Sequence, residues 1–391
     1  MGLFSLFASR RLLTAPATEP VLLPKGHIPA LDGIRGLAIL LVTIYRFSGI
    51  RDYETAAWLK PLLEFGTHGV DLFFVLSGFL ITGILFDSKG DEHYFRNFYA
   101  RRTLRIFPLY YFTLLAVLVL LPLVGVTTGM LKASHPDVSS LWYYGGNVLM
   151  SYRGEWHLGG LNHFWSLCVE EHFYLVWPLV IFACSRTTAM RICVAAFLAS
   201  AGGRVLWMVL GGNSVAPEVF TLFRLDALCA GAWIALAARG PNGLTNLLPG
   251  AKLVALVAGL MLLPVIALHK QIFTIPTTLY ACFFAAFILL AVASAKHDGW
   301  LSFLGKSKLL QWLGRYSYGM YVYQNLLLVG LAAFFTPAIL EQWTGSPAIS
   351  RVVFLISMFA LTCGVAWVSW NVFEKRCLAF KHYFEAKKHA H

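Results

Sequence analysis

Ten long apolar segments, separated by short polar connections, run along this sequence. In windows of about 20 residues, they fall near 33–50, 68–87, 106–126, 165–184, 190–211, 221–238, 250–268, 274–296, 316–336 and 350–373. A helix of about 20 residues spans the hydrocarbon core of a bilayer. With 58% hydrophobic and 13% charged residues, the chain has more apolar surface than a soluble domain can bury. The pattern predicts an all-α polytopic membrane protein with about ten transmembrane helices.

Lysine and arginine concentrate in alternate connections. These cations are Arg10, Arg11, Lys25, Lys89, Arg96, Arg101, Arg102, Arg105, Arg186, Arg191, Lys296, Lys306, Lys308, Arg315, Lys375, Arg376, Lys381, Lys387 and Lys388. The positive-inside rule assigns these connections and both termini to the cytoplasm. We therefore expect a cytoplasmic segment at 1–32, a membrane domain at 33–373 and a basic cytoplasmic tail at 374–391 that lies along the membrane surface.

The net charge of +12 is explained without nucleic acid binding, because cations in short loops on one face are attracted to anionic membrane lipid. The seven cysteines fall mostly inside apolar segments and form no CxxC pair. They therefore indicate small core residues, without a disulfide framework or a metal site.

Two arginines stand eleven positions apart in the first segment, LDGIRGLAILLVTIYRF. Helix geometry returns Arg35 and Arg46 to one face, about 16 Å apart. A cation inside a membrane helix is costly and marks a functional site. Arg46 lies near the outer end of its helix, so its guanidinium could instead extend to the interface.

The segment HFWSLCVEEHFYLVWP, residues 163–178, carries a histidine and two adjacent glutamates. His163 and Glu170 share a helix face if the helix begins early enough. Glu170 or Glu171 could pair with a buried arginine, or Glu170 could orient or activate a base beside an acceptor. His163 alone is typical of a hydrogen-bonded histidine at the membrane interface.

In FYARRTLRIFP, Arg102 and Arg105 lie one turn apart and can bind phosphate oxygens with bidentate hydrogen bonds. The positive charge of these two arginines is also explained without a ligand, because cations on the cytoplasmic side anchor a membrane helix. Asp71 lies close to the outer end of its segment and could be solvated there. Ser77 with Gly78 is interpreted as a helix-packing notch.

Several further polar residues lie at membrane depth, and together they predict a polar cavity within the bundle. They are Arg224, Asp226, Arg315, Tyr318, Tyr321, Gln324 and Asn325. Taken singly, each is equally typical of a hydrogen bond between helices.

Seven segments in order resemble the signatures of the acyltransferase 3 family. They are LDGIRGLA, DLFFVLSGFLIT, FYARRTLRIFPLYY, HFWSLCVEEHFYLVWP, RLDALCAG, LGRYSYGMYVYQ and WNVFEKRC, spread over residues 31–377. The resemblance implies ten core helices in a bacterial inner membrane. It implies transfer of an acyl group, commonly acetyl from acetyl-CoA, to a hydroxyl of a carbohydrate or glycolipid such as a surface polysaccharide. A standalone member without a fused esterase-like domain is expected.

The resemblance also implies roles for particular residues. Arg102 and Arg105 match the paired arginines associated with the phosphorylated donor, and no permanently bound cofactor is expected. Arg35 is expected to organise the donor site, and Glu170 with His163 to support the acceptor side. Acyl-CoA itself would be a substrate.

Arg46 departs from the family pattern, which has a catalytic histidine eleven positions after the first arginine. Arginine stays protonated and has no acceptor, so it cannot be a general base. The chain could be an inactivated variant; the base could have moved to His163 or Glu170; or Arg46 could stabilise an oxyanion or bind an anionic acceptor. A transporter or binding protein that kept the fold and lost the chemistry is the alternative function.

Overall fold

The computed structural model describes Leu23 and residues 26–48, 59–125, 135–268, 275–294 and 299–384. Within these ranges the chain forms helices and no strand. The long helices are α1 (Pro29–Phe47), α3 (Gly69–Asp87), α4 (Tyr94–Leu115), α8 (Trp165–Ala183), α9 (Arg186–Val209), α11 (Thr221–Ala237), α12 (Leu248–Leu268), α13 (Ile275–Ser294), α15 (Lys308–Leu331) and α17 (Pro347–Ser369).

Shorter helical segments extend or connect these helices. They are α2 (Lys60–Glu64), η1 (Phe65–His68), η2 (Ala116–Leu120), α5 (Leu121–Leu123), α6 (His135–Ser139), η3 (Ser140–Tyr143), α7 (Gly146–Arg153), η4 (Gly159–Phe164), α10 (Ala216–Val219), α14 (Ser302–Lys306), α16 (Pro337–Thr344), η5 (Trp370–Glu374), α18 (Lys375–Ala379) and η6 (Phe380–Phe384).

Eight helical stretches in the described residues are long and apolar enough to cross a membrane. They are Lys60–Asp87, Tyr94–Leu123, Gly159–Ala183, Arg186–Val209, Ala216–Ala237, Leu248–Ile266, Ile275–Ser294 and Pro347–Phe384. Each overlaps a predicted segment, which confirms an all-α polytopic membrane protein. The two other predicted segments form α1 and α15, which carry more polar and charged residues. The total of ten spans and the side of the termini stay predictions.

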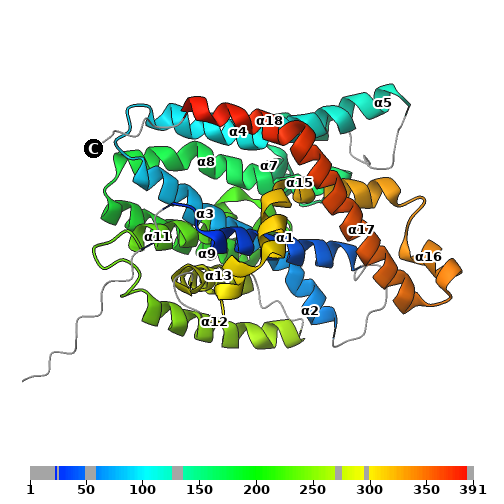
Figure 1. Ribbon diagram of the computed structural model, residues 1–391. Coiled ribbons are helices and arrows are strands. Elements are labelled where there is room, and N and C mark those ends of the chain that lie inside the picture. The colour runs from blue at the N-terminus through cyan, green and yellow to red at the C-terminus, as the bar shows by residue number, and fades with distance from the viewer. Residues whose placement is uncertain are drawn as a thin grey trace, which may run out of the picture.

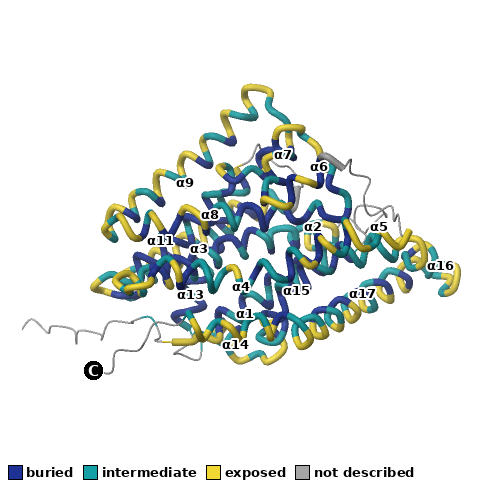
Figure 2. The backbone as a smooth tube through the Cα atoms, turned by 90° about the horizontal axis from the view of Figure 1, so that it is seen from above, coloured by how far each residue is buried: buried dark blue, intermediate teal, exposed yellow. Residues whose placement is uncertain are grey.

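The bundle has a buried centre and an apolar periphery. In the most apolar stretch of α3, 67% of residues are buried, whereas in α9 and α12 the share is 17%. Figure 1 shows α12 and α17 along the outside of the bundle, and Figure 2 shows α9 and α17 there, with α3 and α11 farther in. Large apolar side chains such as Leu256 and Ile356 are exposed there, as expected of helix faces that meet lipid.

Glycines allow two pairs of central helices to approach closely. A Cβ on Gly78 of α3 would collide with the Leu228 carbonyl of α11, and one on Gly231 with the Val75 carbonyl. Gly78 is therefore a packing position, as predicted. A Cβ on Gly36 of α1 would likewise collide with α15. In lipid the hydrophobic effect does not draw helices together, so the van der Waals contacts that this close approach allows are a main source of attraction between them.

Three predicted connecting or terminal segments are only partly described. Residues 1–22, 24–25 and 385–391 lie outside the described residues, as do residues 127–134 of the connection between the predicted segments 106–126 and 165–184. The remainder of that connection forms the short helices α6, η3, α7 and η4. The described part of the tail, α18 and η6, packs against α4 (Figure 1).

Substitution of Gly231 by alanine tests the close α3–α11 contact. We expect Gly231→Ala to destabilise the protein by about 1–3 kcal/mol, because the added methyl group overpacks the interface. The measurement is the melting temperature of the detergent-solubilised protein. Gly364→Ala is the matched control, since nothing lies within 4 Å of its added Cβ. A melting temperature for Gly231→Ala equal to that of the control would contradict this packing.

Candidate functional site

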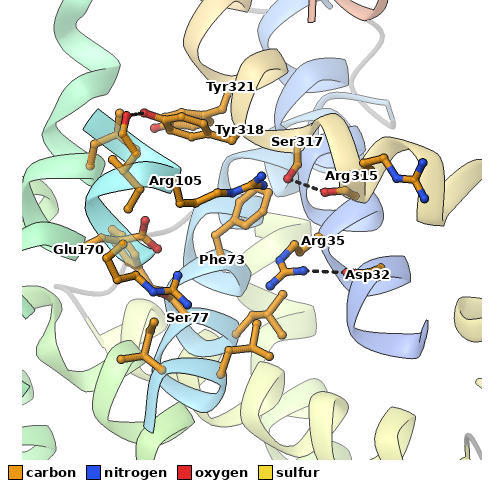
Figure 3. A pocket seen from close by; sticks show the side chains of 18 of the residues that line it. Asp32, Arg35, Phe73, Ser77, Arg105, Glu170, Arg315, Ser317, Tyr318 and Tyr321 are labelled. Atoms are coloured by element: carbon orange, nitrogen blue, oxygen red, sulfur yellow. Dashed lines mark hydrogen bonds and ion pairs between the residues drawn. The ribbon is translucent and has the colours of Figure 1, made fainter. Parts of the chain in front are cut away.

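A cavity of about 540 Å³ lies among α1, α3, α4, α8 and α15. Four predicted site residues line it: Arg35 of α1, Arg102 and Arg105 of α4, and Glu170 of α8. Figure 3 shows Arg35, Arg105 and Glu170 directed toward one space, with Arg315 turned away from it. A polar cavity is therefore present, built by helices distant in sequence. Three of the residues from which it was predicted line it, Arg315, Tyr318 and Tyr321, whereas Arg224, Asp226, Gln324 and Asn325 do not.

The arginines that line the cavity differ in which groups stabilise their positive charge. Arg35 donates from Nη1 to Oδ1 of Asp32 at 2.7 Å. Arg102 and Arg105 form no hydrogen bond or ion pair with any described residue. The Arg102 guanidinium instead lies 5.7 Å from the Tyr174 ring centroid, and that of Arg105 lies 5.3 Å from the Trp370 centroid. Aromatic faces stabilise these cations and leave their N–H donors available to an anion.

Glu170 lines the same cavity, together with Ser77 and Tyr174. Those two hydroxyl groups hydrogen-bond to each other. The Arg102 charge acts on the Glu170 carboxylate, but among the described residues neither glutamate of the pair forms an ion pair with an arginine. Glu171 does not line the cavity, and its buried Oε1 has no hydrogen-bond partner among the described residues.

His163 does not line the cavity but contacts Ser166 and Tyr321, which do. It belongs to η4, and α8 begins only at Trp165, so the condition for His163 to share a helix face with Glu170, an early start of the helix, is not met. The Tyr321 hydroxyl, which lines the cavity, donates to the His163 carbonyl at 2.9 Å. His163 Nε2 donates to the Val322 carbonyl at 3.1 Å. In the neutral ring, Nδ1 therefore carries a lone pair, and it has no hydrogen-bond partner among the described residues.

Arg46 also lies outside the cavity lining, where α1 meets α15. Its Nη1 donates to Oδ1 of Asn325 at 2.6 Å, and Asn325 Nδ2 donates to the Gly160 carbonyl at 2.6 Å. Gly160 and His163 belong to the same short helix, and the charge of Arg46 acts on His163. Arg46 and His163 are thus grouped at one place, separate from the four residues in the cavity.

Other polar residues noted in the sequence serve helix packing. Asp71 is 5% exposed and accepts hydrogen bonds from Arg224 and from His68, so it is not solvated at the helix end. Asp226 pairs with Arg204, at 2.5 Å between fully buried side chains. These pairs join α11 to α3 and to α9, and neither lines the cavity.

Sequence reasoning did not single out Lys381 as a site residue, yet it lines the cavity. The basic tail offered no signal, because several lysines there look alike. In the described part of the chain, no group of three His, Cys, Asp or Glu side chains is placed to hold a metal ion.

Comparisons with known proteins agree with the sequence signatures. The acyltransferase 3 family model, described as an acyltransferase domain, matches residues 28–371. The peptidoglycan O-acetyltransferase OatA of Listeria monocytogenes is 30% identical over 93% of this chain and 58% of its own length. YrhL of Bacillus subtilis, provisionally named a peptidoglycan O-acetyltransferase, is 29% identical over 89% of this chain and 54% of its own length. The chain thus spans little more than half of these relatives, and no solved structure matches it.

The buried Asp71–Arg224 pair is predicted to matter more for stability than the pair between Asp87 and Arg239, which also joins α3 to the α11 region. Asp71→Asn leaves a buried arginine without its counter-charge, which costs about 3–5 kcal/mol. Asp87→Asn should cost about 0–1 kcal/mol, since the Asp87 side chain is 60% exposed. Melting temperatures in detergent compare the two, and equal losses would show that burial does not decide the cost.

Proposed function

Since the chain belongs to the acyltransferase 3 family, we propose that it transfers an acyl group, acetyl first of all, from cytoplasmic acyl-CoA to a hydroxyl of a carbohydrate or glycolipid. The observation that carries this proposal is a cavity lined by two arginines without an anionic partner among the described residues. The phosphates of an acyl-CoA can accept hydrogen bonds from the N–H groups of these arginines. The membrane is a bacterial inner membrane in this proposal.

The donor binds with its phosphates at Arg102 and Arg105. Guanidinium groups form bidentate hydrogen bonds with phosphate oxygens, and these two already face a shared space. Arg35, held by Asp32, adds positive charge to the same cavity. The charge distribution of the loops supports entry from the cytoplasm, because α4 begins next to a strongly cationic connection. The thioester then lies toward Ser166 and Tyr321, the lining residues that contact His163.

The acceptor hydroxyl reacts near His163. The Nδ1 lone pair takes the hydroxyl proton, the hydroxyl oxygen bonds to the thioester carbonyl carbon, and the carbon–sulfur bond breaks. The CoA thiolate leaves and receives the proton. Arg46 cannot accept a proton, so its role here is to stabilise the negative charge that develops on the carbonyl oxygen. Glu170, beside Ser77 and Arg102, orients groups at the cavity.

The carbohydrate acceptor of this proposal is supported by the relatives, whose names concern peptidoglycan, a carbohydrate polymer. One observation favours a second function. Arg46 replaces the histidine that the family uses as a base, which favours a transporter or binding protein without turnover. Thioester consumption that depends on an added hydroxyl acceptor separates an enzyme from such a protein.

Arg102→Ala and Arg105→Ala are each expected to raise the KM for acetyl-CoA about tenfold to a hundredfold, because a hydrogen bond to a charged phosphate is lost. The KM for the acceptor should change less. Initial rates in membranes with radiolabelled acetyl-CoA measure both constants. Arg101→Ala is the matched control, since Arg101 lies on the same helix, bonds to the Asn97 carbonyl and does not line the cavity. Equal effects on donor and acceptor would indicate a folding role instead.

His163→Gln is expected to lower kcat about a hundredfold or more, with the KM for acetyl-CoA unchanged. Glutamine can still donate to the Val322 carbonyl but offers no proton acceptor of comparable basicity. Arg46→His is the companion variant. Faster acyl transfer by Arg46→His would identify the natural chain as an inactivated variant and contradict the role given to His163; an unchanged or lower rate agrees with it.

A further inference from the structure

The C-terminal segment contributes a further cation to the cavity. Lys381 lies in η6, which follows α18 and packs against α4 (Figure 1). The half-buried Lys381 side chain lines the same cavity as Arg102 and Arg105. This segment lies beyond residue 371, where the match to the family model ends. The cavity is therefore completed by a part of the chain outside the matched domain.

Lys381 lies among like charges. The charges of Arg105, Arg102, Arg101 and Arg35 all act on it. It forms no ion pair or hydrogen bond with any residue that the structure describes. Like charges repel more strongly between helices than in water, because the effective dielectric constant is lower there. Such an arrangement costs stability in the empty protein and is offset when an anion binds among the cations.

We propose that Lys381 binds a phosphoryl group of the donor, beside Arg102 and Arg105. This inference rests on the proposed function, in which acyl-CoA is the donor. The two guanidinium groups offer planar pairs of donors, and the lysine ammonium adds a compact charge that can approach a phosphate from another side. The C-terminal segment thereby sets the preference for phosphorylated over unphosphorylated thiol donors.

The test uses Lys381→Met in the full-length, detergent-purified protein. Methionine keeps an apolar stem of similar length and removes the charge. We expect the Kd for CoA to rise about tenfold, as for the loss of one charge-assisted hydrogen bond. The Kd for pantetheine, which has no phosphate, should change less than about twofold. A third probe, 3′-dephospho-CoA, assigns the phosphate: a loss confined to CoA indicates the 3′-phosphate, and a loss with both nucleotides indicates the pyrophosphate.

Two controls separate binding from folding. Lys375→Met removes an exposed lysine from α18 that does not line the cavity, and should leave the Kd for CoA unchanged. Without ligand, Lys381→Met should melt at the same temperature as wild type or higher, because repulsion among the cations is relieved. A purely structural lysine would lower the melting temperature and weaken binding of CoA and pantetheine equally, which would overturn the inference.

The outcomes also separate this inference from the proposed function. Wild type that binds CoA through Lys381 but transfers no acyl group refutes the proposed function alone. Active acyl transfer with unchanged CoA binding by Lys381→Met refutes the inference alone. Wild type that binds CoA no more tightly than pantetheine refutes both.

Discussion

A charge enclosed between helices needs a partner, and this requirement organises the bundle. Desolvation of an ion costs several kcal/mol even after relaxation, unless an opposite charge and hydrogen bonds compensate it. Asp71 with Arg224, and Asp226 with Arg204, meet this requirement within the protein. Because each pair joins two helices, the same contacts that satisfy the charges also fix α3, α9 and α11 relative to one another.

Arg102 and Arg105 are informative because they do not follow that pattern. Their guanidinium groups rest against aromatic rings and point into a cavity, without a carboxylate in ion-pair contact among the described residues. A cation–π contact contributes only about 0.5–2 kcal/mol, less than the cost of desolvation. Carboxylates at longer range contribute as well, Glu170 toward Arg102 and Glu374 toward Arg105. The N–H donors themselves are left for water or for an anion that enters the cavity. Arg204 and Arg224, which pair with buried aspartates, are structural contacts. Arg102 and Arg105, which have no such ion pair among the described residues, have the character of a binding site.

The sequence predicted the fold better than it predicted the site. Segment length and apolarity locate the helices, because a membrane span must be long and must satisfy its own backbone. Motif residues Arg35, Arg102, Arg105 and Glu170 line one cavity, and their chemical roles there stay predictions. The solvation of Asp71 could not be judged from its place near a helix end, because its partner Arg224 lies 153 positions away.

The seam between α1 and α15 explains why some positions escaped prediction. Gly36 allows the two backbones to approach closely, and Thr43 Oγ1 donates to Gln324 Oε1 at 3.1 Å across the same seam. Polar pairs in such a seam need a matching residue on the other helix, which no single segment reveals. Arg46 illustrates the consequence: its bond to Asn325 and its proximity to His163 depend on α1, α15 and η4 together. Arginine in place of the family's histidine at this position therefore takes part in a small network of Asn325, Gly160 and the neighbouring His163, and in the proposed mechanism His163 is the proton acceptor.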